Sequence, residues 1–219
     1  MKRTLLTLIA VAMVFSLLLL GDSYAQGLTA KGLKAGLNIA NFGGSDAENN
    51  SSIMGFAVGG FVVWSFSDNF GIRPEILYSK KGSELKVEDE TTLFPFTGTF
   101  NLHYLEIPIL FQYTIPTPGS FKPNIFIGPS LSIVLDSKVD LDVLGIGIEV
   151  DYEDIKTTDF GLVFGVGAVW NDKFTIDARY SLGLTSIDDT AKDDEEAWIE
   201  SPPYDLKNNV ISVMVGYSF

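Results

Sequence analysis

The chain has 219 residues, no cysteine, a single histidine and a formal net charge of −13. Such acidity repels nucleic acid, so we expect no nucleic-acid partner. Without cysteine there is no disulfide framework, so a secreted chain of this size must be held together by packing or by strand closure. A positive mean hydropathy together with 21 glycines and 12% aromatic residues is typical of a β-barrel.

The first 25 residues have the pattern of a secretory signal peptide. Lys2 and Arg3 form a charged start, Leu5–Leu20 is apolar, and 23–25 supplies the small residues of a cleavage site. The apolar stretch has 16 residues, fewer than the ~20 that a membrane-spanning helix needs. We therefore expect a cleaved signal peptide at 1–25.

The mature chain, 26–219, is expected to form one domain of eight strands. Its segments alternate apolar side chains with small or polar ones, which is the period of two that a strand produces. In chain order these segments are 31–40, 54–66, 70–81, 100–114, 123–136, 157–170, 174–187 and 208–219.

The last of these segments points most clearly to a membrane. One face carries an apolar row that ends in an aromatic residue at the chain terminus, Ile211, Val213, Val215, Tyr217 and Phe219. A strand that closes a barrel in a bilayer has this form, because its apolar face meets lipid. We expect the barrel-assembly machinery of the outer membrane to recognise this strand through Val213, Val215, Tyr217 and Phe219.

The connections between the segments alternate in length. Short links at 67–69, 115–122 and 171–173 separate long acidic ones at 41–53, 82–99, 137–156 and 188–207. One rim of a bacterial outer-membrane barrel has short turns in the periplasm, and the other has long loops outside. The alternation therefore predicts long loops outside the cell and both termini in the periplasm.

Two of the long connections contain further strand patterns. Val139–Val143 and Ile146–Val150 alternate as a hairpin that would extend the barrel beyond the bilayer, and 83–87 with 92–96 shows a weaker version. The fold predicted from these features is an eight-stranded antiparallel up-and-down transmembrane β-barrel. A soluble lipocalin-like barrel is the alternative, and it would turn its apolar rows inward.

Two sets of side chains are candidate site residues. Aromatic residues at strand ends beside the short turns are expected to form an interfacial belt, in which the ring is buried and its polar edge stays wet: Trp64, Phe66, Tyr113, Trp170, Tyr217 and Phe219. Charged residues recur on the inward-facing rows: Lys34, Arg73, Glu75, Glu106, Asp159, Asp177 and Arg179.

The inward charges have a structural and a functional interpretation. An eight-stranded barrel encloses just enough room for side chains. This favours the structural interpretation, in which the charges form ion pairs that fill the lumen, and disfavours the functional one, in which they line a path for ions or protons. Glu106 with Arg73 or Arg179 is the pairing that we expect.

Several stretches resemble the outer-membrane barrel family that includes PorT, small barrels of Gram-negative bacteria often labelled "porin family". The matching stretches are 71–82, 104–110, 128–130, 159–165 and 179–184. The resemblance implies a barrel in the outer membrane. PorT itself is associated with a secretion system, which the resemblance makes one expected role.

Catalysis and metal binding have little support in the sequence. His103 is the single histidine, and no serine lies within two residues of it, so a hydrolase site of the kind found on outer-membrane lipid enzymes is not assembled locally. The acidic loops lack the spacing of a calcium-binding loop. We expect no catalytic residue, no metal and no cofactor.

The sequence thus predicts a non-enzymatic outer-membrane barrel with a filled lumen, in contact with outer-membrane lipid. Its role would be structural, secretion-accessory or the binding of an extracellular or envelope protein. A narrow pore for small solutes is the alternative, and a lipid-modifying enzyme is the third hypothesis.

Overall fold

The computed structural model describes residues 27–45, 50–87, 96–143, 146–151, 156–187 and 205–219. The expected signal peptide and most of the connection at 188–207 lie outside these residues. Across the described residues the chain forms nine strands, which are β1 (Leu28–Gly43), β2 (Asn50–Ser65), β3 (Phe70–Val87), β4 (Phe96–Thr114), β5 (Phe121–Val143), β6 (Ile146–Asp151), β7 (Thr158–Trp170), β8 (Phe174–Gly183) and β9 (Lys207–Ser218). No helix among these residues is long and apolar enough to cross a membrane.

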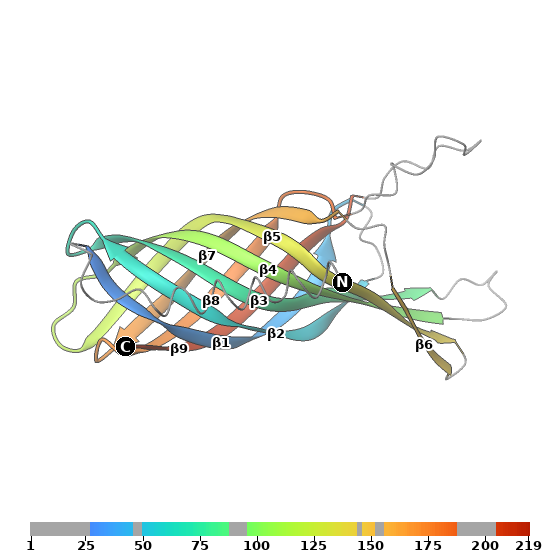
Figure 1. Cartoon of the computed structure of the whole chain (residues 1–219), viewed down its shortest axis with the longest axis horizontal. Helices are drawn as coiled ribbons and strands as arrows, with labels where there is room; N and C mark the ends of the chain where they lie inside the picture. The colour runs from blue at the N-terminus through green and yellow to red at the C-terminus, as the bar shows by residue number, and fades with distance from the viewer. Residues whose placement is uncertain (1–26, 46–49, 88–95, 144–145, 152–155, 188–204) are drawn as a thin grey trace.

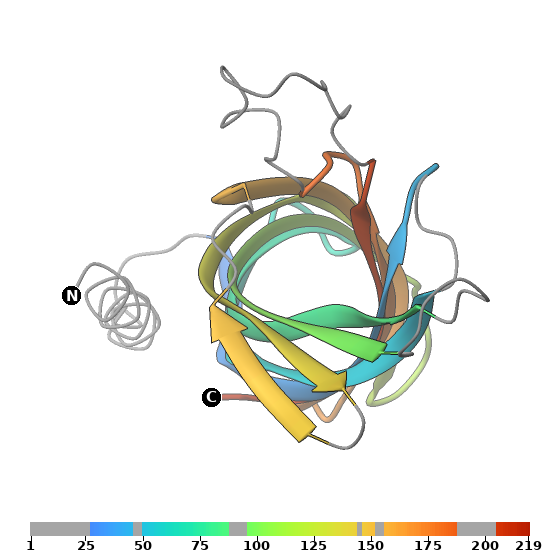
Figure 2. The same ribbon diagram turned by 90° about the vertical axis from the view of Figure 1, so that its right-hand side faces the viewer.

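Eight of the strands close into a barrel (Figure 1). Their order is β4-β3-β2-β1-β9-β8-β7-β5, all neighbours pair antiparallel, and a β4–β5 pairing completes the ring. The ring is visible in the view from the long-loop end (Figure 2). Closure leaves no sheet edge to present unpaired backbone groups to lipid. The predicted eight-stranded antiparallel barrel is confirmed.

The sheet extends beyond the barrel on the long-loop side. The far end of β5 pairs with β6 from Lys138 to Val143, so the predicted hairpin is present, although its tip at 144–145 is outside the described residues. The second extension is present in part, since β3 runs to Val87 and β4 starts at Phe96. The remaining residues of that extension, 92–95, are also outside the described part.

One predicted strand is too long. The alternating pattern was expected to continue to Ile187, whereas β8 ends at Gly183. Ile187 is buried and packs with Phe42, Leu102 and Tyr104 at the long-loop end of the lumen.

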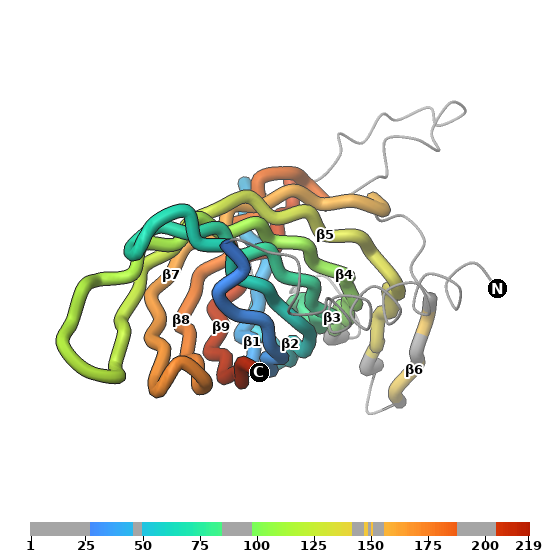
Figure 3. Tube along the Cα trace, turned by 60° about the vertical axis from the view of Figure 1, so that its left-hand side comes forward, coloured from blue at the N-terminus to red at the C-terminus, as the bar shows by residue number. Residues whose placement is uncertain are grey.

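The short links all lie at one end of the barrel, where the chain also terminates (Figures 1 and 3). Asn171 and Asp172 have φ angles of 52° and 56°, the backbone conformation of a type I′ hairpin turn. The amide of Phe219 donates to the carbonyl of Lys31, which fixes the end of β9 beside the start of β1. The ends of the described chain thus share the short-turn rim.

The apolar rows face outward and the mixed rows face the lumen. On β9 Val213 and Val215 are 52% and 61% exposed, while Ser212 and Met214 are buried. The same alternation holds on the other barrel strands, whose inward rows combine small, polar and charged residues with some large apolar ones, such as Phe61, Leu110 and Phe126. The lipocalin-like alternative is therefore wrong, because it requires the apolar rows inside.

A β-bulge lies in the long-loop half of β5. His103 is opposite Asp136 and Tyr104 is opposite Val134, which leaves Leu135 as an extra residue in β5. Because of this extra residue, the odd-numbered residues of β5 face outward before the bulge and inward after it. Toward the short turns Ile125, Ile127 and Pro129 are exposed, whereas past the bulge Val139 is buried and Asp140 is exposed.

Candidate functional site

The middle of the lumen holds a cluster of five charged side chains, Lys34, Arg73, Glu75, Asp177 and Arg179, called here the five-charge cluster. Each of these side chains is at most 3% exposed. They come from β1, β3 and β8, so the cluster joins distant parts of the barrel wall. Side chains alternate between the two faces of a strand, and each of these five belongs to the row that faces the lumen. The alternation in the sequence therefore brings them together.

Two carboxylates bind three cations in this cluster. Lys34 Nζ lies 2.7 Å from Glu75 and 2.6 Å from Asp177. Arg179 donates from Nη1 to Glu75 and from Nη2 to Asp177, both at 2.7 Å. Arg73 is less closely bound, with Nε 3.0 Å from Glu75 and Nη2 3.4 Å from Asp177.

Aromatic rings complete the surroundings of the cations. Arg73 and Arg179 lie over the ring of Phe126, at 4.5 and 5.4 Å from its centroid, and Lys34 lies 5.0 Å from that of Phe61. A ring face attracts a cation, and most strongly where water is absent. Gly165 makes room for this arrangement, because a β-carbon there would lie 2.7 Å from the Phe126 ring.

A second group of polar side chains lies toward the long loops. Lys81 forms an ion pair with Glu106, and Lys81 also lies over the ring of Tyr104. Asn208 donates to the hydroxyl of Tyr104 at 2.8 Å, and Asp159 accepts from Thr185 at 2.8 Å. The predicted pairing of Glu106 with Arg73 or Arg179 is therefore wrong.

Lys81 is the residue that the sequence analysis missed. It has the same parity as Arg73 and Glu75 on β3, and that parity could have placed it in the lumen. Register explains its partner, because Lys81 pairs with Leu102 and so projects beside the inward row of β4 that carries Tyr104 and Glu106.

Between the two groups the lumen is packed with small polar residues together with Leu77, Val163 and Met214. Asn38 donates to Ser79 at 2.9 Å and accepts from Ser212 at 2.8 Å. Two voids in this region have volumes of about 10 Å³ each, which is room for no more than one water molecule apiece. Side chains thus occupy the lumen from the five-charge cluster to Lys81.

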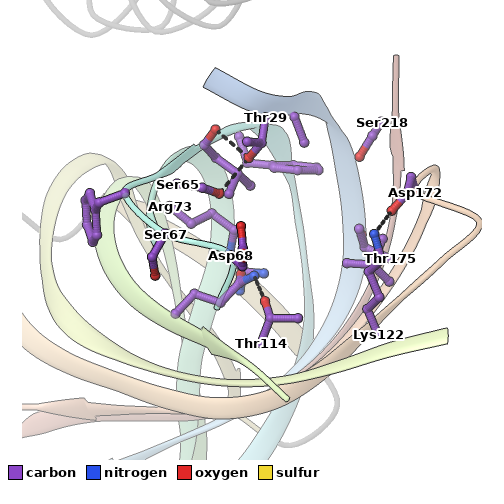
Figure 4. Close-up of a pocket in the computed structure, with 16 residues that line it drawn as sticks. Thr29, Ser65, Ser67, Asp68, Arg73, Thr114, Lys122, Asp172, Thr175 and Ser218 are labelled. Carbon is purple, nitrogen blue, oxygen red and sulfur yellow. Dashed lines mark hydrogen bonds and ion pairs between the residues drawn. The ribbon is translucent and has the colours of Figure 1, made fainter. Parts of the chain in front are cut away.

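Toward the short turns the lumen is hollow. A cavity of about 740 Å³ lies there, and Arg73, Phe61 and Thr175 are among the residues that line it. Arg73 and Thr175 are labelled in Figure 4. The turn residues Asp68 and Asp172 form part of its outer end. We call this cavity the vestibule.

The expected belt residues lie outside the barrel at the same end. Trp64, Phe66, Trp170, Tyr217 and Phe219 are exposed, and Tyr113 is half-buried. Ring contacts join neighbouring strands, with centroids 4.9 Å apart for Phe70 and Tyr113 and 5.5 Å apart for Phe174 and Tyr217.

His103 faces outward near the bulge. Its Nδ1 lies 2.6 Å from the Tyr78 hydroxyl, and its cross-strand neighbours are Lys80 and Asp136. Tyr78, Lys80 and Asp136 are not serines, so these three neighbours do not provide the serine nucleophile of a lipid hydrolase. In the described part of the chain, no three His, Asp or Glu side chains gather as metal ligands would. Much of the acidic sequence, including 88–90 and 193–196, is outside that part.

Comparison with protein families identifies the chain. Residues 24–189 match the family model described as "Outer membrane protein beta-barrel domain". The chain belongs to this family. It is therefore an outer-membrane β-barrel protein, in agreement with the closed barrel and its apolar exterior. The search of curated proteins gave no match.

Solved structures similar to this family member are also small barrels. Neisserial surface protein A is 15% identical with a TM-score of 0.46, and the match covers 89% of this chain and 100% of that one. Ail of Yersinia pestis is 14% identical with a TM-score of 0.42 over 89% and 100%. OprG from Pseudomonas aeruginosa is 12% identical with a TM-score of 0.49 over 88% and 97%. At such identities the likeness does not carry an activity to this chain.

Proposed function

We propose that this protein is a non-conducting, non-enzymatic outer-membrane barrel that presents its long acidic loops to a protein partner outside the cell or in the envelope. In this proposal residues 1–25 are removed as a signal peptide, and both termini lie in the periplasm. Resemblance to PorT-like barrels makes a secretion-accessory role one form of it.

The observation that carries the proposal is the five-charge cluster. The nitrogen and oxygen atoms of its ion pairs are 2.6–3.4 Å apart, and these pairs cross the lumen. The voids beyond the cluster have volumes of only about 10 Å³ each. An ion that passed would have to separate buried ion pairs, and breaking such a pair costs about 3–5 kcal/mol. A permeation path is therefore unfavourable in this state of the barrel.

The outer surface supports the membrane part of the proposal. The exposed apolar rows match a lipid environment, and the exposed aromatic residues at the short-turn end would form the interfacial belt. Val213, Val215, Tyr217 and Phe219 on β9 supply the row that we assign to recognition by the barrel-assembly machinery.

Electrical recording in planar bilayers tests the proposal. The purified wild-type protein is expected to give no stable conductance steps, with a known open porin recorded in the same membranes as the positive control. Reproducible wild-type steps would instead establish the narrow pore.

The enzymatic alternative has a separate test. If His103 were part of a lipid-modifying active site, cells carrying His103→Ala would have lipid A of a different structure from that of cells with the wild-type protein. We expect the lipid A of the two strains to be identical.

A further inference from the structure

The vestibule has the size and lining of a ligand site. Its volume of about 740 Å³ lies within the range of about 300–1,000 Å³ that is usual for small-molecule sites. Hydroxyl groups dominate its polar lining, from Thr29, Ser65, Ser67, Thr114, Thr175 and Ser218 (Figure 4). Such groups can donate hydrogen bonds to oxygen atoms of a ligand.

The charge beside the vestibule is unbalanced. The five-charge cluster contains three cations and two carboxylates. Among the described residues the other buried charges are Lys81, Glu106 and Asp159, so four cations and four carboxylates are buried in all. The surplus carboxylate, however, belongs to the group near the long loops. The surplus cation remains at the vestibule end.

Arg73 is the member of the cluster that lines the vestibule. It is 2% exposed, and its Nε and Nη2 atoms have no hydrogen-bond partner, although both lie near carboxylate oxygens. Arg179 makes hydrogen bonds of 2.7 Å to both Glu75 and Asp177, and of its nitrogens Nε alone is buried without a partner. Arg73 is thus the less satisfied of the two guanidinium groups.

The remaining charges of the lining do not remove this surplus. Lys122 forms an exposed ion pair with Asp172 at 2.6 Å, so these two charges offset each other. Asp68, in the exposed turn between β2 and β3, is the other carboxylate of the lining. It lies at the mouth, where water weakens but does not abolish its repulsion of an anion.

We propose that the vestibule binds a small organic anion that carries a carboxylate or phosphate group. The anion's charged group lies against the guanidinium of Arg73, and the hydroxyl groups of the wall bind its other oxygen atoms. A surplus buried charge is costly where water is scarce, and a counter-ion reduces that cost. Charge-assisted hydrogen bonds to arginine are among the strong ones in proteins. This inference goes beyond the proposed function and does not depend on whether the lumen conducts.

Isothermal titration calorimetry tests the proposal on the full protein purified from outer membranes in detergent. Sodium phosphate and sodium acetate are the two probes, and the one that binds more tightly identifies the preferred group. Arg73→Gln is expected to weaken binding about 10- to 100-fold, the equivalent of one hydrogen bond to a charged group. Thr175→Val, which removes a wall hydroxyl at nearly constant volume, is expected to weaken it several-fold.

Two further variants keep the test decisive if Arg73→Gln does not fold. Asp68→Asn removes a repelling charge from an exposed turn and should tighten binding, whereas Lys81→Gln alters the distant group and should leave binding within twofold. Bromide soaked into crystals should give an anomalous peak beside Arg73. Absence of binding by both probes, or equal binding by the wild type, Thr175→Val and Asp68→Asn, would overturn the proposal.

Discussion

Arg179 binds Glu75 through both terminal nitrogens of its guanidinium group, with Nη1 2.7 Å from Oε2 and Nη2 3.3 Å from Oε1. The two residues are 104 positions apart and lie on β8 and β3, on either side of β9, β1 and β2. Their contact therefore runs across the lumen. It links separate parts of the barrel wall by a paired hydrogen bond whose planar geometry only arginine provides.

Removing the Glu75 charge should destabilise the barrel more than removing any exposed charge. Glu75→Gln leaves three buried cations with one carboxylate, and we expect a loss of about 3–5 kcal/mol in the free energy of unfolding. Reversible unfolding in phospholipid vesicles measures it. Asp172→Asn is the matched control, because it breaks the exposed pair with Lys122 and should cost less than about 1 kcal/mol. Equal losses in the two variants would contradict a structural role for the cluster.

The pairing of Lys81 with Glu106 can be tested by a double-mutant cycle. We expect Lys81→Met and Glu106→Gln to be coupled by about 0.5–3 kcal/mol, because the two side chains are in direct contact. A parallel cycle between Glu106→Gln and Arg73→Met should show additivity within about 0.5 kcal/mol. The reverse result would restore the pairing that the sequence pattern suggested.

The outward orientation of β9 predicts a depth-dependent cost of inserting charge. Val213 lies near the middle of the strand and is 52% exposed, so Val213→Arg should cost about 2–4 kcal/mol in a bilayer. Phe66→Arg, beside a short turn, should cost no more than about 1 kcal/mol. Unfolding in vesicles gives both values. The same cost at both positions would argue against the membrane placement.

Asp205 should titrate below its ordinary range. The Lys207 ammonium donates to its carboxylate at 3.0 Å, and this hydrogen bond lowers the pKa of Asp205. A lowered folded-state pKa stabilises the protein above the unfolded pKa of about 3.9, and that contribution is lost as the pH falls through the folded pKa.

Carboxyl NMR titration in nanodiscs measures this pKa, and Lys207→Met should return it toward the ordinary value. Melting temperatures of the wild type and Lys207→Met should differ above pH 4 and converge in more acidic solution. An unchanged Asp205 pKa in the variant would show that Lys207 is not its cause.

The sequence by itself was sufficient for the barrel, its eight strands, the short-turn rim and the orientation of the apolar rows. These follow from local regularities: a side-chain period of two, turn residues such as Asn171 and Asp172, and the lengths of the links. These signals depend only on residues that are close together in the sequence. Once the strands and turns are set, closure of the sheet leaves few possible strand orders.

Only the tertiary structure decided which inward charges meet. Parity places Arg73, Glu106 and Arg179 in the lumen, but the height of each residue depends on strand tilt and on the register between strands that are far apart in the sequence. Register joins Glu106 to Lys81 and Glu75 to Arg179, and the bulge at Leu135 exchanges the faces of β5. The vestibule and its surplus cation arise in the same way, because no single segment of the chain contains them.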